Sequence, residues 1–121
     1  MVMYNQLPIY RDSYLLLTEI YKVTTKFPRD YKYTLGQDMK RDVLSLFRDL
    51  YGANVSADKR QHHLDNFLTS FELLKIEIRL CVDLNVLSIN KLAQLSLIMD
   101  SIAKQAQGWR KKSVKAMPKS C

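Results

Sequence analysis

The chain has 121 residues, a formal net charge of +7 and a hydrophobic content of 47%. This length and composition are typical of one globular domain and argue against a disordered chain. Three isolated glycines cannot form a phosphate-binding loop, which argues against a nucleotide-binding α/β enzyme, and the longest uncharged stretch, Met1–Tyr10, is too short to span a membrane.

Apolar residues recur at helical spacing in the first predicted helix, from about residue 10 to residue 26. One stripe of this helix carries Ile9, Leu16, Ile20, Val23 and Phe27. An adjacent stripe carries Tyr10, Tyr14, Leu17 and Tyr21. The helix therefore presents a wide apolar face. Pro28 disfavours helical backbone at the residue before it, so we expect the helix to end at Phe27.

The second predicted helix begins at Thr34, where Thr34 and Gln37 have the spacing of a capping box. In such a box the threonine hydroxyl accepts a free backbone amide and the glutamine reaches back to the cap. The apolar positions that follow are Leu35, Met39, Val43, Leu46 and Leu50. Gly52 and Asn54 both adopt left-handed backbone readily, which predicts the end of the helix.

The third and fourth predicted helices follow with short connections. The third begins near Ser56 and runs to Leu84, with a stop at Asn85. Its apolar face carries Leu64, Phe67, Leu68, Phe71, Leu74, Ile78, Cys81 and Val82. Ser88 is the expected cap of the fourth helix, and Gly108 is its expected end. The apolar face of the fourth helix carries Ile89, Leu92, Leu95, Met99, Ile102 and Ala106.

Four amphipathic helices joined by short connections predict an all-α fold, an antiparallel up-down four-helix bundle over residues 1–112. Residues 113–121 are expected to form a basic, disordered C-terminal tail. The first and third predicted helices carry more apolar surface than one bundle seam uses, which predicts a homo-oligomer.

Positive charge is concentrated in two segments. Residues 1–109 hold 14 Lys and Arg against 12 Asp and Glu, whereas residues 110–121 hold five basic residues and no acid. A second concentration consists of Lys22, Lys26, Arg29 and Lys32, opposed only by Asp30. Clustered positive charge favours a polyanionic partner, which RNA, DNA or an acidic protein face can supply. A solubilising tail is the alternative interpretation of the C-terminal segment.

No motif predicts catalysis or a metal site. His62 and His63 are adjacent and point about 100° apart on a helix, so they cannot chelate one ion as an i,i+4 pair does. Cys81 lies on an apolar face, and Cys121 is the last residue. We therefore expect no enzyme activity, no cofactor and no metal. The absence of a secretory signal and of a cysteine pair predicts a cytoplasmic protein that does not bind a membrane.

Several basic residues beyond the two charged segments are candidates for partner contacts. Lys40 and Arg41 lie in the first half of the second predicted helix, and Arg79 interrupts the apolar run Ile76–Leu80. Aromatic residues that lie among basic ones are typical of surfaces on which bases stack, and packing at the edge of the core is the alternative. These aromatic residues are Tyr31, Tyr33 and Trp109.

Four short strings of the sequence resemble the accessory variability determinant family of diversity-generating retroelements. They are Phe27-Pro28-Arg29, Tyr33-Thr34-Leu35-Gly36, Ile78-Arg79-Leu80 and Gln107-Gly108-Trp109, and the resemblance covers about residues 10–112. It departs from the family at Gln107, where the family has a glycine. A related four-helix bundle family, encoded in intervening sequences of ribosomal RNA genes, is the alternative. Its characteristic string is missing from residues 44–52.

The resemblance implies a ring-like homopentamer that binds the reverse transcriptase and the template RNA of the retroelement. It implies that the protein supports mutagenic cDNA synthesis without being an enzyme. The related family implies instead a protein-interaction module of unspecified activity. Under the retroelement interpretation, the candidate nucleic-acid-binding residues are Lys26, Arg29, Lys32, Lys40, Arg41, Arg79, Arg110, Lys111 and Lys112.

Overall fold

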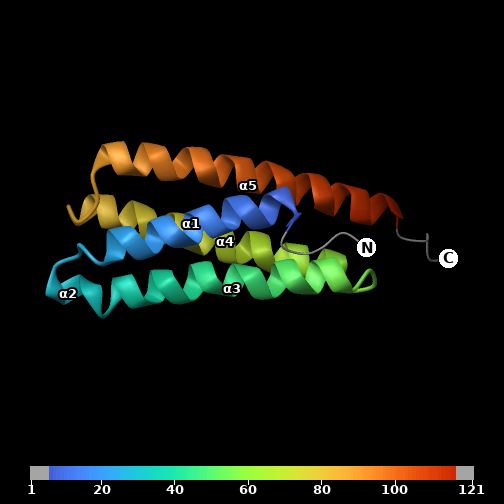
Figure 1. The fold of residues 1–121 in the computed structure, drawn as a ribbon, viewed down its shortest axis with the longest axis horizontal. Coiled ribbons are helices and arrows are strands. Elements are labelled where there is room, and N and C mark those ends of the chain that lie inside the picture. Colours follow the sequence, from blue (N-terminus) through green and yellow to red (C-terminus); the bar gives the residue numbers. More distant parts are fainter. Residues whose placement is uncertain (1–5, 117–121) are drawn as a thin grey trace.

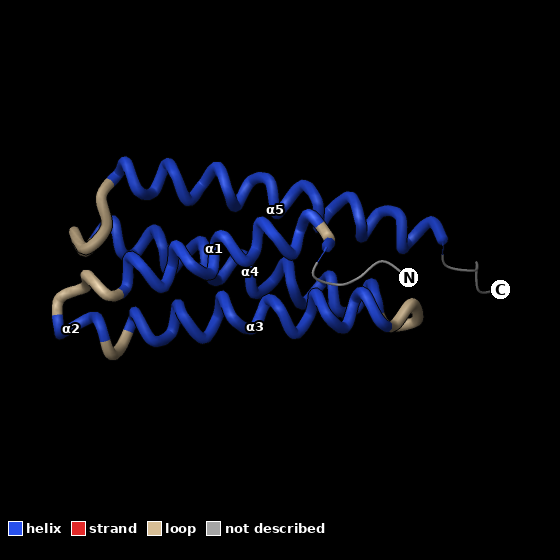
Figure 2. The backbone as a smooth tube through the Cα atoms, in the orientation of Figure 1, coloured by secondary structure: helices blue, strands red, loops and turns tan. Residues whose placement is uncertain are grey.

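The computed structural model describes residues 6–116, which form four long helices and one helical turn without a β-strand (Figures 1 and 2). The elements are α1 (Pro8–Thr24), α2 (Arg29–Lys32), α3 (Leu35–Val55), α4 (Arg60–Asp83) and α5 (Ile89–Ala116). Successive long helices run in opposite directions, and both α1 and α4 pack against α3 and α5. The prediction of an all-α four-helix bundle is confirmed.

The core consists mainly of the residues on the predicted inner faces. Leu16, Met39 and Leu95 are fully buried, and the stacked rings of Phe67 and Phe71 have centroids 5.9 Å apart. Burial of such surface is the main contribution to the stability of a bundle of this size. The prediction was wrong for Ile89, which is 73% exposed. Ile89 lies six residues before Leu95. At about 100° a residue, this spacing places it about 120° away from the inner face of the helix.

Helix boundaries around α3 differ from the predicted ones. No side chain caps α3, because the Thr34 hydroxyl donates instead to the backbone oxygen of Asp30, 2.9 Å away. The helical turn α2 lies directly before Thr34 and supplies this carbonyl. Gly52 does not end α3, since no glycine of the described residues has a positive φ and the helix continues to Val55. The next helix begins at Arg60 rather than near Ser56.

The connection between α4 and α5 follows the prediction. Asn85 has a φ of 62°, a left-handed conformation that asparagine tolerates better than most residues. The Oγ atom of Ser88 accepts the backbone N–H of Lys91 at 3.1 Å and so caps α5. Residues 84–88 therefore form a defined turn that leads from α4 to α5 at the same end of the bundle as α2 (Figure 1).

The end of α5 lies beyond the predicted one. The helix continues through Gly108 to Ala116, and the Ser113 hydroxyl donates to the backbone oxygen of Trp109 at 3.0 Å. A glycine inside a helix costs about 1 kcal/mol but does not stop it. Residues 113–116 are therefore helical rather than part of a disordered tail. Residues 117–121 lie outside the described part of the chain. None of the described helices has the length and hydropathy that a membrane crossing requires.

Candidate nucleic-acid interface

The bundle has two ends of different chemistry. The α2 end consists of the last turns of α1, the turn α2, residues 84–88 and the first turn of α5 (Figure 1). The Trp109 end consists of residues 56–59, which connect α3 to α4, and the residues of α5 around Trp109. The candidate basic residues are divided between these two ends and the surfaces of α3 and α4.

The α2 end gathers four basic residues of the predicted concentration. Lys22 lies in the last turn of α1, Lys26 follows it, and Arg29 and Lys32 belong to α2. Pro28 precedes α2 directly, and the chain reverses direction between α1 and α3, so these four residues lie at the same end of the bundle (Figure 1). Within residues 6–116, no hydrogen bond or ion pair engages these four side chains. They are therefore available to an external anion.

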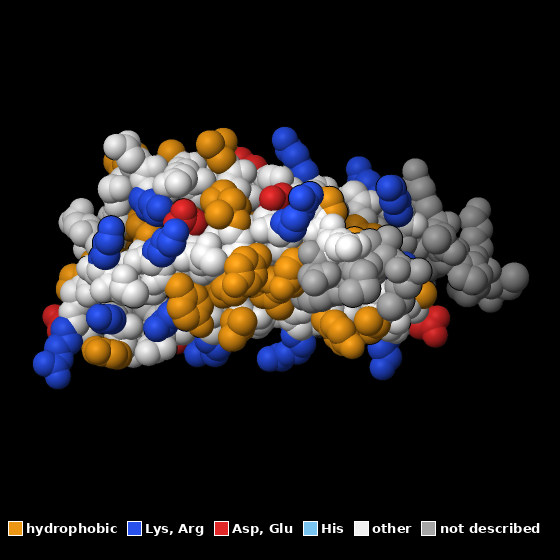
Figure 3. All heavy atoms as spheres, viewed as in Figure 1, with side chains coloured by type: hydrophobic (Ala, Val, Ile, Leu, Met, Phe, Trp, Pro, Cys, Tyr) orange, Lys and Arg blue, Asp and Glu red, His pale blue; other side chains and the backbone are white. Residues whose placement is uncertain are grey.

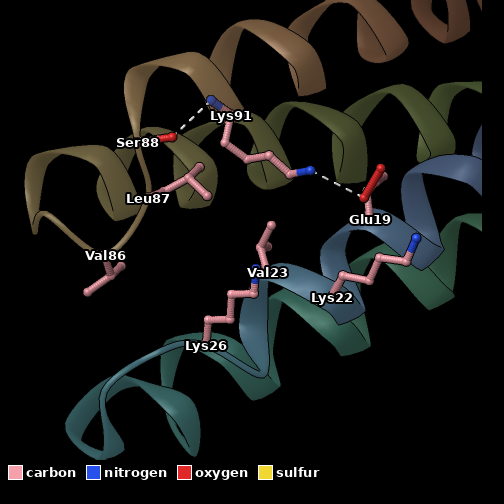
Figure 4. Close-up of a pocket in the computed structure, with 8 residues that line it drawn as sticks. All are labelled: Glu19, Lys22, Val23, Lys26, Val86, Leu87, Ser88 and Lys91. Carbon is pink, nitrogen blue, oxygen red and sulfur yellow. Dashed lines mark hydrogen bonds and ion pairs between the residues drawn. The ribbon is translucent and has the colours of Figure 1, made fainter.

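A hollow of about 310 Å³ lies beside these charges, between α1 and residues 86–91. In Figure 4, Val23 and Leu87 point toward one another across it, with lysine side chains at its edge. The Nζ atom of Lys91 lies 3.3 Å from Oε2 of Glu19, so the one acid of this hollow is paired with a lysine. The hollow is lined by Glu19, Lys22, Val23, Lys26, Val86, Leu87, Ser88 and Lys91.

Tyr33 adds an exposed aromatic ring to the α2 end. It is 64% exposed and lines a second hollow with Phe27, Arg29 and Lys32. This agrees with the predicted juxtaposition of aromatic and basic residues. Tyr31, by contrast, is half-buried and packs against the core.

Three candidate residues lie on the long helices α3 and α4 rather than on α2 or the end of α1. The Nζ atom of Lys40 lies 5.5 Å from the centre of the Tyr21 ring, between α1 and α3. Arg41 forms ion pairs with Asp38 at 3.1 Å and Asp42 at 3.4 Å, and both carboxylates raise its pKa. Arg79 lines a hollow between α4 and α5.

The remaining candidates lie at the Trp109 end. Arg110 forms an ion pair with Asp65 of α4, whereas Lys111 and Lys112 are exposed. The Trp109 ring is half-buried against the core, and the Arg60 guanidinium lies 5.7 Å from its centre. Trp109 therefore serves packing, which is the alternative that the sequence left open.

Lys91 was missed by reasoning from the sequence, and Lys22 was noted but not selected. Lys91 is far from Lys22 and Lys26 along the chain, and only the fold brings them to one hollow. A signal was present, because an antiparallel bundle places the start of its last helix beside the end of its first. The predicted cap at Ser88 would have located that start.

Cys81 and His63, which were considered for chemistry, both contact other side chains of the bundle. Cys81 is buried, its Sγ atom lies 3.4 Å from Sδ of Met39, and burial raises the pKa of its thiol to about 12. Nδ1 of His63 lies 3.2 Å from Oδ1 of Asp49. Among residues 6–116, no group of three or more His, Cys, Asp or Glu side chains is placed to hold a metal ion.

Apolar side chains remain exposed on two faces. The α1–α3 face carries Tyr14, Tyr21 and Leu44, and Figure 3 shows hydrophobic side chains gathered over the middle of the side on which α1 lies. The α4 face carries Leu73, Ile76 and Leu80. The α1–α3 face includes the second apolar stripe of the first predicted helix. The α4 face consists of the surplus apolar residues of the third predicted helix.

These features define a basic four-helix bundle that, within the described residues, carries a cluster of four unpaired cations at its α2 end and exposes apolar surface on its sides. The family model described as bAvd-like, for bacterial accessory variability determinants, matches residues 2–113. The chain therefore belongs to the bAvd-like family, and the resemblance drawn from the sequence is confirmed. No protein of curated function matches the chain.

Proposed function

We propose that this protein is the accessory protein of a diversity-generating retroelement. It binds the template RNA and the reverse transcriptase and supports mutagenic cDNA synthesis. The observation that carries this proposal is the family match over residues 2–113.

The α2 end supports RNA binding. Lys22, Lys26, Arg29 and Lys32 are not neutralised within the described part of the chain, so they can each contact a phosphate and release counterions. One such cluster supplies only a few phosphate contacts. In a homo-oligomer the same cluster is repeated, and several weak contacts to one RNA act together.

The exposed apolar faces support protein contacts. We assign the α1–α3 face to contacts between copies of the chain in a ring-like homo-oligomer, a pentamer in the proposed form. We assign the α4 face to the reverse transcriptase. Contiguous exposed apolar surface is typical of protein interaction sites.

The proposed role is not catalytic. The deeply buried Cys81 thiol keeps its proton at neutral pH, which argues against a nucleophile. His63 contacts Asp49 and packs against Gly52 of α3, so its ring has a structural role. The protein then acts by positioning RNA and polymerase.

Reconstituted reverse transcription tests the proposal. A reverse transcriptase of a diversity-generating retroelement is combined with its template RNA, with or without the protein, and the cDNA is quantified and sequenced. We expect mutagenic cDNA only when the protein is present and none from the protein alone. Equal cDNA yield and mutation frequency without the protein would contradict the proposal.

Molar mass in solution tests the assembly. A pentamer has five times the chain mass of 14.2 kDa. The double variant Tyr14→Lys, Leu44→Lys places charge on the α1–α3 face and is expected to lower the mass measured by light scattering. Leu97→Lys is the control, because Leu97 is 74% exposed on α5, outside both faces. A monomeric wild-type protein would refute the proposed ring.

A further inference from the structure

The hollow between α1 and residues 86–91 has features that a flat charged surface lacks. Its volume of about 310 Å³ is at the low end of the roughly 300–1,000 Å³ typical of small-ligand sites. Val23 and Leu87, each 8% exposed, contribute apolar surface to its interior. Lys22 and Lys26 lie along the α1 side (Figure 4).

The charges of the hollow favour an anion. Lys91 is held by Glu19 and by Oε1 of Gln94, 3.0 Å from its Nζ atom, which offsets the negative charge of Glu19. Three lysines and one glutamate give the lining a net charge of +2. The Ser88 oxygen accepts the backbone N–H of Lys91, so its hydroxyl proton remains available to donate to an anion.

The combination of apolar interior and basic edge restricts the ligand. A purely apolar molecule would place its surface against ammonium groups, and a bare phosphate would leave Val23 and Leu87 uncovered. A nucleotide carries both a phosphate and a less polar body. The volume, at the low end of the range for small-ligand sites, is suited to a single nucleotide unit.

We propose that this hollow is a site for one nucleotide, with the phosphate near Lys22 and Lys26 and the base and sugar against Val23 and Leu87. Where the nucleotide belongs to an RNA strand, the site rests on the proposed function and adds to it a defined contact. A free nucleotide is the other source of the same chemistry, and the experiment below separates the two.

Substitution of Ser88 provides a matched pair of variants. Asp and Asn cap helices about as well as Ser, so Ser88→Asp and Ser88→Asn both retain the start of α5. Only Ser88→Asp places a negative charge at the hollow. Ser56→Asp is the charge-matched control, because Ser56 accepts the Lys59 backbone N–H at 3.4 Å at the opposite end of the bundle.

Adenosine monophosphate is the first probe, with affinity measured by NMR titration of the full-length protein. We expect Ser88→Asp to weaken its binding at least tenfold, and Ser88→Asn to weaken it by a smaller factor, because the asparagine amide can still donate and adds no charge. Ser56→Asp should change it less than twofold. Inorganic phosphate should bind more weakly than adenosine monophosphate. Equal affinity of wild type and Ser88→Asp, or of the two probes, would overturn the proposed site.

Competition with single-stranded RNA identifies the source. Displacement of adenosine monophosphate by RNA, together with weaker RNA binding by Ser88→Asp than by Ser56→Asp, supports a nucleotide of the strand. Simultaneous binding of both supports a free-nucleotide site. RNA binding without any binding of adenosine monophosphate overturns the site and leaves the proposed function intact. Binding of the nucleotide by a protein that does not bind RNA overturns the RNA-binding function and not the site.

Discussion

The two ends of the bundle differ in whether their arginines are paired within the described residues. At the Trp109 end, Arg110 pairs with Asp65, and Arg60 donates to the backbone oxygen of Ala53 at 2.6 Å while lying over the Trp109 ring. These arginines hold α5 and α4 together. At the α2 end, Lys26 and Arg29 have no such partner within residues 6–116.

The comparison shows that charge counted along the chain does not predict which charges are available. The segment after Trp109 has the densest positive charge of the sequence, but Asp65 of α4 already neutralises its first residue. The α2 end draws its basic residues from separate segments of the chain, and its one acid in the hollow, Glu19, pairs with Lys91 rather than with Lys22 or Lys26.

The largest expected effect is on the free energy of unfolding. It arises at the seam between α3 and α4 rather than at either end of the bundle. Asp42 and Glu77 are each 9% exposed there, and burial together with Asp42 raises the pKa of Glu77 from 4.5 to about 8, against a smaller opposite effect of Arg41. The folded protein thus keeps a proton that the unfolded chain releases near pH 4.5. Stability should therefore fall as pH rises from about 4.5 to 8.

Glu77→Gln should remove this decrease and raise the free energy of unfolding by roughly 2–4 kcal/mol at pH 9. Urea unfolding at pH 5 and pH 9 measures the effect. Glu72→Gln is the control, because Glu72 is exposed and pairs with Lys75 on the same helix. A wild-type stability that is equal at both pH values would show that Glu77 titrates normally.

The next effect concerns helix packing, rather than RNA binding, at the Trp109 end. A Cβ atom at Gly52 would overlap the His63 ring, whose Cδ2 atom would lie 2.7 Å away, whereas one at Gly108 would meet no atom within 4 Å. Gly52→Ala should lower the free energy of unfolding by about 1–3 kcal/mol. Gly108→Ala should raise it by about 0.5–1 kcal/mol. Thermal unfolding measures both, and equal shifts would contradict the close packing of α3 on α4.

The smallest effect compares one arginine from each end. Arg29→Gln and Arg110→Gln remove the same charge, but Arg29 is unpaired in the described residues and Arg110 is bound to Asp65. We expect Arg29→Gln to weaken RNA binding roughly threefold and Arg110→Gln to change it less than twofold. Fluorescence anisotropy with labelled RNA measures the difference. The reverse order would place the RNA contact at the Trp109 end.

Helical periodicity was sufficient to predict the bundle, because each long helix must bury one face. The turn from α4 to α5 was predicted as well, since Asn85 and Ser88 act locally. The start of α3 was not, because the partner of Thr34 is a carbonyl supplied by α2. The role of Gly52 was also missed. It depends on His63 of another helix rather than on backbone conformation.

The candidate interface was predicted only in part. Lys26, Arg29 and Lys32 are close in sequence, and the fold keeps them together. Lys91 lies at the same end because the bundle is antiparallel. A count of charges along the sequence does not take this topology into account. The pairing of Arg41 and Arg110 depends on the acids around them, and for Arg110 that acid lies on another helix.

The central claim is that the α2 end is the RNA interface. Its direct test is the salt dependence of RNA affinity for a variant with Lys22, Lys26, Arg29 and Lys32 replaced by Gln. A charge-matched control replaces Arg11, Arg48, Lys59 and Lys104, which are exposed elsewhere. At about 0.7 for each phosphate contact to single-stranded RNA, the first variant should lower the slope of log affinity against log salt by up to roughly 3. The control should retain the wild-type slope, and equal losses in both variants would contradict the account.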